Sequence, residues 1–117
     1  MPYSYETHTI ASIAPIGATL FGDAPALGMV GERAISYAEL ETCSRQTAQR
    51  LIGAGIHPGD RVAILSESMP AWGVASLGIA RAGAVAVPLL VDFKASQVCE
   101  ILQHAGAGIA FASKKQR

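Results

Sequence analysis

Few residues of this sequence have the type and position to do chemistry. Two carboxylates, Glu67 and Asp92, each follow an apolar run that reads as a buried strand, and open α/β sheets bind ligands beyond the carboxyl ends of their strands. A carboxylate there could act as an acid or base. Lone carboxylates are more often turn or cap residues, so we assign no catalytic, cofactor-binding or metal-binding residue.

The histidines and cysteines do not assemble into a site either. His8, His57 and His104 fall in a tail, a turn and a helix end, so no Ser–His–Asp set can be built from them. Cys43 and Cys99 lie in separate helical patterns, without a C-x-x-C or C-x-x-H metal spacing. We expect both cysteines to be small buried hydrophobic residues in a reducing cytoplasm.

Two other features have a structural and a functional interpretation. Gly53-x-Gly55-x-x-x-Gly59 faintly resembles a phosphate-binding loop, but it follows a helix and precedes a strand, the reverse of the order that points amides at a phosphate. We interpret these glycines as helix-stop residues. Trp72 could line an apolar groove, but its place at the start of an apolar helix favours the core.

The composition indicates one globular domain and excludes several classes of function. Half of the 117 residues are apolar, and nine basic side chains balance nine acidic ones. Because nucleic-acid-binding domains carry a clustered basic excess, we expect no nucleic-acid partner. Lys114, Lys115 and Arg117 are typical of a solvated tail. Residues 1–9 carry no signal-peptide pattern and are expected to be loosely ordered, which favours a cytoplasmic location.

The strongest local pattern opens at Ser36. Ser36 and Glu39 have the spacing of a capping box, in which each side chain accepts a hydrogen bond from the other residue's amide. A long helix follows, and its inward stripe is predicted at Leu40, Cys43, Thr47, Ala48 and Leu51. Glu41 and Arg45 are spaced as an i,i+4 ion pair on its surface.

Further helices and strands are predicted before and after this long helix along the chain. A helical pattern from residue 10 to about 20 precedes a hairpin with a two-residue type II′ loop at Gly31-Glu32. Apolar runs predict buried strands over 61–65 and 84–90 and a third strand over 108–113. Helical patterns over 70–82 and 98–105 lie between them. Gly73 and Gly78 in the first of these helices predict close backbone packing. The fold class is therefore α/β: an N-terminal hairpin, then α-β-α-β-α-β around a mainly parallel sheet.

One stretch, residues 69–91, is apolar and long enough to cross a bilayer. Arg81 would then lie near mid-span, where a charge is costly, and Pro88 would break the last helical turns. We therefore expect no transmembrane segment.

The ordered set of motifs resembles the adenylate-forming enzymes: acyl-CoA synthetases, non-ribosomal adenylation domains and luciferases. "ISYAEL" at Ile35–Leu40 is similar to the family's first signature, and Arg81-Ala82-Gly83-Ala84-Val85 through Pro88 is similar to its second. "GIHPGDRVAIL" lies between them with the family's spacing, and the likeness covers about residues 10–113.

Two departures bear on the substrate and on a local turn. Pro70-Ala71-Trp72-Gly73 is most similar to the "PEW" element of long-chain fatty acyl-CoA synthetases, with Ala71 in place of the acid. Leu89-Leu90-Val91-Asp92 lacks the second proline often found after Pro88. The Pro70-Ala71-Trp72 element suggests a fatty-acid substrate. The missing second proline leaves the conformation of the turn after Pro88 undetermined.

The resemblance implies a parent enzyme that joins a carboxylate to ATP, releases pyrophosphate and passes the acyl group to CoA. ATP, magnesium and CoA belong to that parent, because no position here matches the family's phosphate loop, magnesium ligand or catalytic lysine. We therefore expect residues 10–113 to be a partial N-terminal subdomain, inactive alone, with 114–117 as a basic tail or point of truncation.

Two readings remain open. Either the chain is the N-terminal fragment of an AMP-forming long-chain fatty acid–CoA ligase, with the rest of that enzyme as its partner, or it is a free-standing α/β interaction module without catalysis. The fragment would expose apolar surface and a sheet edge, so its self-association is expected.

Overall fold

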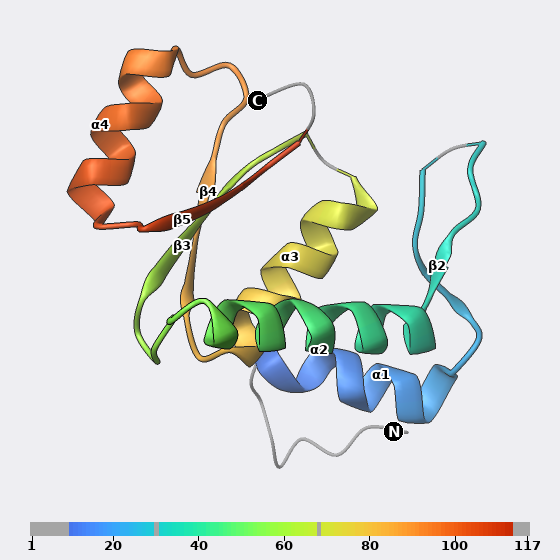
Figure 1. The fold of residues 1–117 in the computed structure, drawn as a ribbon. Helices are drawn as coiled ribbons and strands as arrows, with labels where there is room; N and C mark the ends of the chain where they lie inside the picture. The colour runs from blue at the N-terminus through green and yellow to red at the C-terminus, as the bar shows by residue number, and fades with distance from the viewer. Residues whose placement is uncertain (1–9, 30, 68, 114–117) are drawn as a thin grey trace.

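A computed structural model of the chain describes residues 10–29, 31–67 and 69–113 (Figure 1). Its elements, in chain order, are η1 Ile10–Ser12, α1 Ile13–Phe21, β1 Pro25–Leu27, β2 Ile35–Ser36, α2 Tyr37–Gly53, β3 Arg61–Leu65, α3 Pro70–Arg81, β4 Val85–Leu89, α4 Ala95–Ala105 and β5 Ile109–Ala112. The predicted α/β class and the predicted order of elements are confirmed. The tail at 1–9 and the basic residues at 114–117 lie outside the described residues.

The strands form two sheets. β1 and β2 pair antiparallel, and β3, β4 and β5 form a parallel sheet in the order β4-β3-β5. In Figure 1, α3 and α4 lie on opposite sides of the parallel sheet, and α1 and α2 lie side by side below α3 in this view. The chain therefore runs from β3 outward to β4 and then returns across β3 to β5.

The N-terminal hairpin exists, but its loop differs from the predicted one. The strands end at Leu27 and restart at Ile35, so the connection is longer than two residues. The amide of Glu32 donates to the Met29 carbonyl at 3.1 Å, and Gly31 has a φ of +83°. The predicted type II′ loop is wrong, because Gly31 is the third residue of this turn and supplies the positive φ there.

Helix α2 starts as predicted. The Glu39 amide donates to Ser36 Oγ at 3.1 Å, and the Ser36 amide donates to Glu39 Oε1 at 3.2 Å, which completes the capping box. The helix ends at Gly53, and Gly55 follows with a φ of +98°. Helix-stop glycines thus account for this segment, which lies before the amino end of β3.

Part of the stripe predicted on α2 is wrong. Leu40, Ala48 and Leu51 are buried, but Cys43 is exposed and Ser44 is fully buried in its place. The contact with α3 falls one residue later than the apolar pattern suggests, because Gly78 lets α3 approach Ser44 and Thr47 closely. Cys99 is also exposed, so the expectation of two buried cysteines is wrong.

Glycines on α3 make close packing possible. A Cβ atom at Gly73 would lie 2.6 Å from Leu27 Cδ1, and one at Gly78 would lie 2.5 Å from Thr47 Cγ2. Real Cβ atoms do not approach other heavy atoms so closely, so a side chain at either position would force Leu27 or Thr47 to shift. The predicted close packing is confirmed, and its partners lie in β1 and α2.

Strand β4 is an edge strand rather than a strand buried on both faces. Val85 is 50% exposed, and Leu90, just after the strand, is 65% exposed. The Val85 amide donates to the Asp60 carbonyl at 2.7 Å, so the backbone groups of Val85 point toward β3. Because backbone N–H and C=O groups point to alternate sides along a strand, those of Pro88, three residues later, point away from β3. Pro88 is tolerated because an edge strand needs no donor on its outer side.

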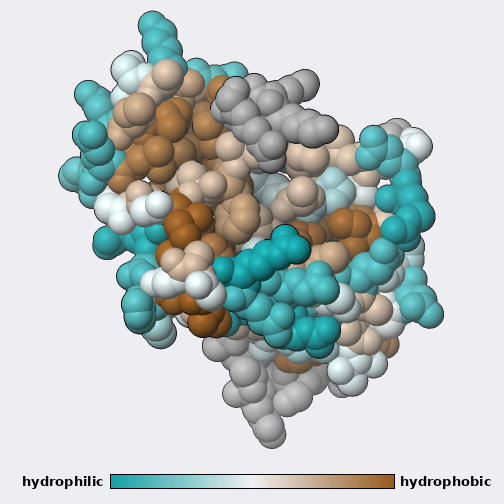
Figure 2. All heavy atoms as spheres, viewed as in Figure 1, coloured by the Kyte–Doolittle hydropathy of each residue, from teal (hydrophilic) through white to brown (hydrophobic). Residues whose placement is uncertain are grey.

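The core lies between α2, β3 and α3. It comprises Ala48, Leu51, Val62, Ile64, Ala75, Ile79 and Ala82. Helix α4 contributes no fully buried residue, and Figure 2 shows apolar surface over the region where Figure 1 places this helix.

None of the helices in the described residues has the length and apolar composition to span a membrane.

Candidate functional site

The carboxyl ends of β3 and β5 meet the first turn of α3 around a groove of about 430 Å³. Its lining consists of Ile64, Ser66, Met69, Ala71, Trp72, Ala75, Phe111, Ala112 and Ser113. The strands bring these residues together because β3 and β5 are parallel and in register, with Ile64 opposite Phe111. Pro70, at the first position of α3, directs the chain from β3 into the helix that carries the opposite wall.

Trp72 satisfies both of its sequence interpretations. The indole packs against the core cluster, and it also lines the groove. The sequence reasoning did not find Met69, Phe111 and Ser113, because their only signal is a position next to a strand end and their proximity depends on strand order.

The two hydroxyls of the groove differ in their bonding. Ser66 Oγ donates to the Glu67 carbonyl oxygen at 2.9 Å. Ser113 Oγ is buried and has no hydrogen-bond partner among the described residues, although the Ser113 amide donates to the Leu65 carbonyl at 3.1 Å. The groove therefore holds one buried hydroxyl, Ser113 Oγ, to which the described residues offer no hydrogen bond.

The sequence candidates do not converge on this groove or on one another. Glu67 follows β3 and Asp92 follows β4, but neither lines the groove. His57 lies 3.8 Å from Asp60 in the exposed turn before β3, His104 is exposed in the last turn of α4, and His8 lies outside the described residues. No group of three or more His, Cys, Asp or Glu side chains within residues 10–29, 31–67 and 69–113 could hold a metal.

The groove does not fit a nucleotide. A triphosphate needs positive side chains or a bound cation around it, and none of the described residues that line the groove is charged. We therefore derive no step with ATP or magnesium from these residues.

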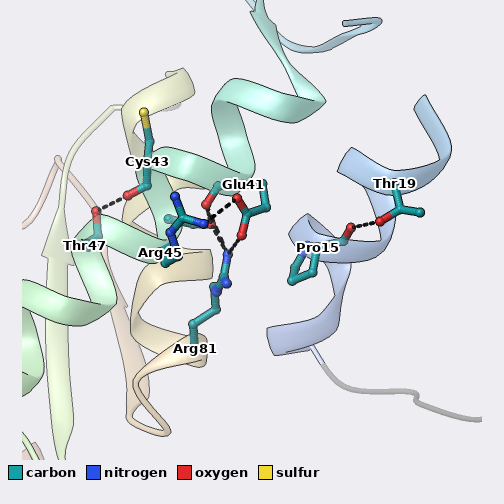
Figure 3. A network of polar contacts seen from close by, with 8 residues as sticks. Pro15, Thr19, Glu41, Cys43, Arg45, Thr47 and Arg81 are labelled. Atoms are coloured by element: carbon teal, nitrogen blue, oxygen red, sulfur yellow. Dashed lines mark hydrogen bonds and ion pairs between the residues drawn. The ribbon is translucent and has the colours of Figure 1, made fainter. Parts of the chain in front are cut away.

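A second polar cluster ties α2 to α3 (Figure 3). Arg81 Nη1 donates to Glu41 Oε1 at 3.0 Å, to the Glu41 carbonyl at 3.1 Å and to Ser44 Oγ at 3.2 Å. The Arg81 and Glu41 side chains are only 17% and 18% exposed. Arg45 approaches the other Glu41 oxygen at 3.5 Å, which confirms the predicted i,i+4 pair. The cluster is a structural ion pair, because Arg81 Nη1 and the Glu41 carboxylate are directed at each other across the contact between α2 and α3.

Replacing Arg81 by methionine is expected to lower the free energy of unfolding by roughly 1–3 kcal/mol, because Glu41 and Ser44 lose a half-buried charged donor. Urea unfolding followed by circular dichroism measures the loss. Arg45→Met is the control, since its 50% exposed side chain should contribute less than about 1 kcal/mol. Equal losses in the two variants would contradict the structural role of Arg81.

The capping box at Ser36 carries a second, exposed ion pair. Arg33 donates to both oxygens of Glu39, at 2.9 and 2.8 Å. These hydrogen bonds, with that from the Ser36 amide, lower the pKa of Glu39 from 4.5 to about 2. The ionised carboxylate is therefore favoured in the folded chain.

This shift predicts a pH dependence of stability. A depressed carboxylate pKa stabilises the fold above pH 4.5, and the contribution is lost as the pH falls towards 2. The urea midpoint of Glu39→Gln should decline less than that of the parent chain over this range. Glu100→Gln, at an exposed position on α4, should keep the parent decline; the same flattening in both variants would refute the assignment.

Comparison with known proteins defines the class to which this fold belongs. The AMP-binding enzyme family matches residues 17–117, and the chain belongs to this family. It is 40% identical over 82 residues to a 3-[(3aS,4S,7aS)-7a-methyl-1,5-dioxo-octahydro-1H-inden-4-yl]propanoyl:CoA ligase of Mycobacterium tuberculosis, a match that covers 70% of this chain and 16% of the ligase.

The other similarities span two branches of the family. Surfactin synthase subunit 2 of Bacillus subtilis is 35% identical over 85 residues, which is 73% of this chain and 2% of the synthase. A fatty acyl CoA synthetase structure from Mycobacterium tuberculosis superposes with a TM-score of 0.85 at 27% identity, over 92% of this chain and 22% of that one. The chain thus spans a small part of each relative and matches ligases and peptide synthetases alike.

Proposed function

We propose that this chain is the opening segment of an AMP-forming fatty acid–CoA ligase, in which it acts as scaffold. The observation that carries the proposal is the family match over residues 17–117, combined with the CoA ligase as a relative at 40% identity. The fatty-acid substrate is supported by the Pro70-Ala71-Trp72 element and by the likeness to a fatty acyl CoA synthetase structure. Residues 10–113 form the partial subdomain in this proposal.

The reaction proposed for the whole enzyme requires groups that stabilise charge on the leaving pyrophosphate. In our proposal the rest of the enzyme supplies these groups, together with the sites for ATP, magnesium and CoA. The role of this chain is to hold β3, β4 and β5 in register behind α2 and α3. The parent acts in the cytoplasm, as expected from the sequence.

Pyrophosphate release tests both parts of the proposal. The chain alone, given ATP, magnesium, palmitate and CoA, should release no more pyrophosphate than a blank. The longer protein that contains this segment should release pyrophosphate with fatty acids and CoA. Turnover by the chain alone would refute the scaffold role, and release with amino acids instead of fatty acids would refute the substrate.

The apolar surface favours the opening-segment proposal over the free-standing module. Ile10, Ile13 and Leu90 are 62%, 51% and 65% exposed, and α4 buries no residue fully. Such surface is normally covered by further protein. We therefore expect the isolated chain to self-associate in sedimentation velocity, whereas a compact monomer at all concentrations would support the module.

A further inference from the structure

The parallel sheet ends in two strands whose outer edges differ in composition. In the order β4-β3-β5, both β4 and β5 pair with β3 on one side, and no other described strand pairs with their outer sides. An open edge presents backbone N–H and C=O groups that can pair with a strand of another chain. Each of the two edges is therefore a possible interaction surface.

The edge of β4 is protected by its proline. The backbone groups of Pro88 point away from β3, and proline has no N–H to donate on that side. A proline on an edge strand is one of the features that prevent pairing with another chain. Strand β4 is therefore a poor template for a further strand.

The edge of β5 carries no such protection. The Ser113 amide donates to the Leu65 carbonyl at 3.1 Å, so the backbone groups of Ser113, and by alternation those of Phe111, point toward β3. Those of Ala110 and Ala112 consequently point outward, and Ala110 is exposed. Residues 108–113 include neither a proline nor a charged side chain. This edge therefore offers N–H and C=O groups that nothing in the sequence of the strand protects.

A second copy of β5 fits this edge. Antiparallel pairing of two such strands about a two-fold axis at Phe111 sets Ala110 of each copy opposite Ala112 of the other. Because the backbone groups of both alanines point outward, these residues form the hydrogen-bonded pairs of an antiparallel ladder. A charge on the strand would face a like charge across the axis and oppose the pairing, but β5 has none.

Phe111 adds apolar contact to this pairing. It would face Phe111 of the second copy in a non-hydrogen-bonded pair, the position at which side chains of antiparallel strands lie closest. The Phe111 side chain is only partly buried, although it packs against the core cluster and lines the groove beside α3. Because aromatic cross-strand pairs stabilise a sheet, this contact favours the same alignment as the backbone does.

We propose that the outer edge of β5 is a dimer interface, at which two copies of this chain join their sheets through an antiparallel β5–β5 pair. Association stops at the dimer because Pro88 protects the other edge of each sheet. The inference locates the self-association expected above, and it does not depend on the reaction proposed for the parent enzyme.

Amide hydrogen exchange followed by nuclear magnetic resonance tests the interface directly. Exchange at Ala110 and Ala112 should slow as the protein concentration rises through the dimerisation range, which sedimentation equilibrium measures. The amide of Ala86 points outward at the opposite edge, on β4, so its exchange should not change with concentration. A monomer at every concentration, or a dimer in which Ala110 and Ala112 exchange as fast as Ala86, would overturn the proposal.

Lysine substitutions at the two edges form a matched pair of variants. Ala110→Lys places like charges close to each other on one face of the joined sheet and should weaken the dimer about tenfold or more. Val85→Lys places the same charge on the same face of β4, at a side chain that is 50% exposed, and should leave the dissociation constant of the dimer unchanged. Equal weakening by both variants would assign the association to general apolar surface instead.

A proline on β5 tests the backbone pairing itself. Ala110→Pro removes an outward N–H and no hydrogen bond to β3, so the strand should stay in the sheet, as β4 does with Pro88. We expect the variant to be monomeric at concentrations at which the parent chain is dimeric, with an unchanged far-ultraviolet circular dichroism spectrum. Dimerisation as tight as that of the parent chain would exclude the β5 edge as the interface.

The dimer and the ligase proposal fail separately. The association measurements use the chain alone, without ATP or CoA, so a dimer formed through another surface would overturn only the β5 interface. Absence of pyrophosphate release by the longer protein would refute the ligase and leave the dimer of this chain unaffected.

Discussion

Replacing Ile79 by alanine is expected to lower the free energy of unfolding by about 2–5 kcal/mol. Ile79 is 0% exposed and lies in the core cluster that joins α3 to α2 and β3. Truncation removes buried methyl groups and leaves a cavity that the two helices cannot fill without moving. Urea unfolding of the two chains, followed by far-ultraviolet circular dichroism, measures the difference.

Ile52 provides the control for this change. It lies on α2 and is 56% exposed, so Ile52→Ala removes little buried surface. We expect a change of no more than about 0.5 kcal/mol. If Ile52→Ala were as destabilising as Ile79→Ala, the core would not lie where the structure places it.

Replacing Gly78 by valine should lower the free energy of unfolding by about 3 kcal/mol. The new Cβ atom would lie 2.5 Å from Thr47 Cγ2 and 3.2 Å from the Ser44 carbonyl oxygen, so α3 would have to move away from α2. Gly78→Ala should cost less, about 1 kcal/mol, because the helix propensity of alanine offsets part of the overpacking. Thermal and urea unfolding both report the loss.

Gly53 separates steric overlap from helix propensity. It ends α2, and a Cβ atom there would meet nothing within 4 Å. Gly53→Ala should therefore raise the free energy of unfolding by about 0.5–1 kcal/mol. A stabilising effect of Gly78→Val, in contrast, would show that α2 and α3 do not pack as closely as described.

The packing of α2 on α3 is what positions the candidate groove. Trp72 reaches the groove from the first turn of α3, and Gly78 and Arg81 hold the same helix against α2 two turns later. Changes at Gly78 should therefore alter Trp72 emission even in the folded chain. The scaffold role and the groove depend on the same helix contact.

Local features of the sequence predicted most of the elements correctly. The capping box at Ser36 and Glu39 and the proline at the start of α3 act within one turn of chain, so neighbouring residues are enough to recognise them. The last helix shows the limit of this reasoning. It begins at Ala95 rather than at 98, because Ser96 and Gln97 are polar and fall outside the apolar pattern.

Predictions about which side chains are buried succeeded less well. Ser44 rather than Cys43 is buried on α2, because Arg81, 37 residues later, supplies its hydroxyl with a hydrogen-bond donor. The second apolar run proved to be an edge strand, since β5 pairs on the other side of β3. Neither partner can be found from spacing along the chain.

The sequence by itself determined the family, the order of helices and strands and the starts of α2 and α3, because each depends on residues a few positions apart or on motifs in a fixed order. The tertiary structure decided which strand is central, which faces are buried and that Trp72, Phe111 and Ser113 surround one groove. These properties depend on contacts between residues distant in sequence, which form only when the parallel strands take their order β4-β3-β5. The groove is therefore a product of topology, whereas the helices that wall it were encoded locally.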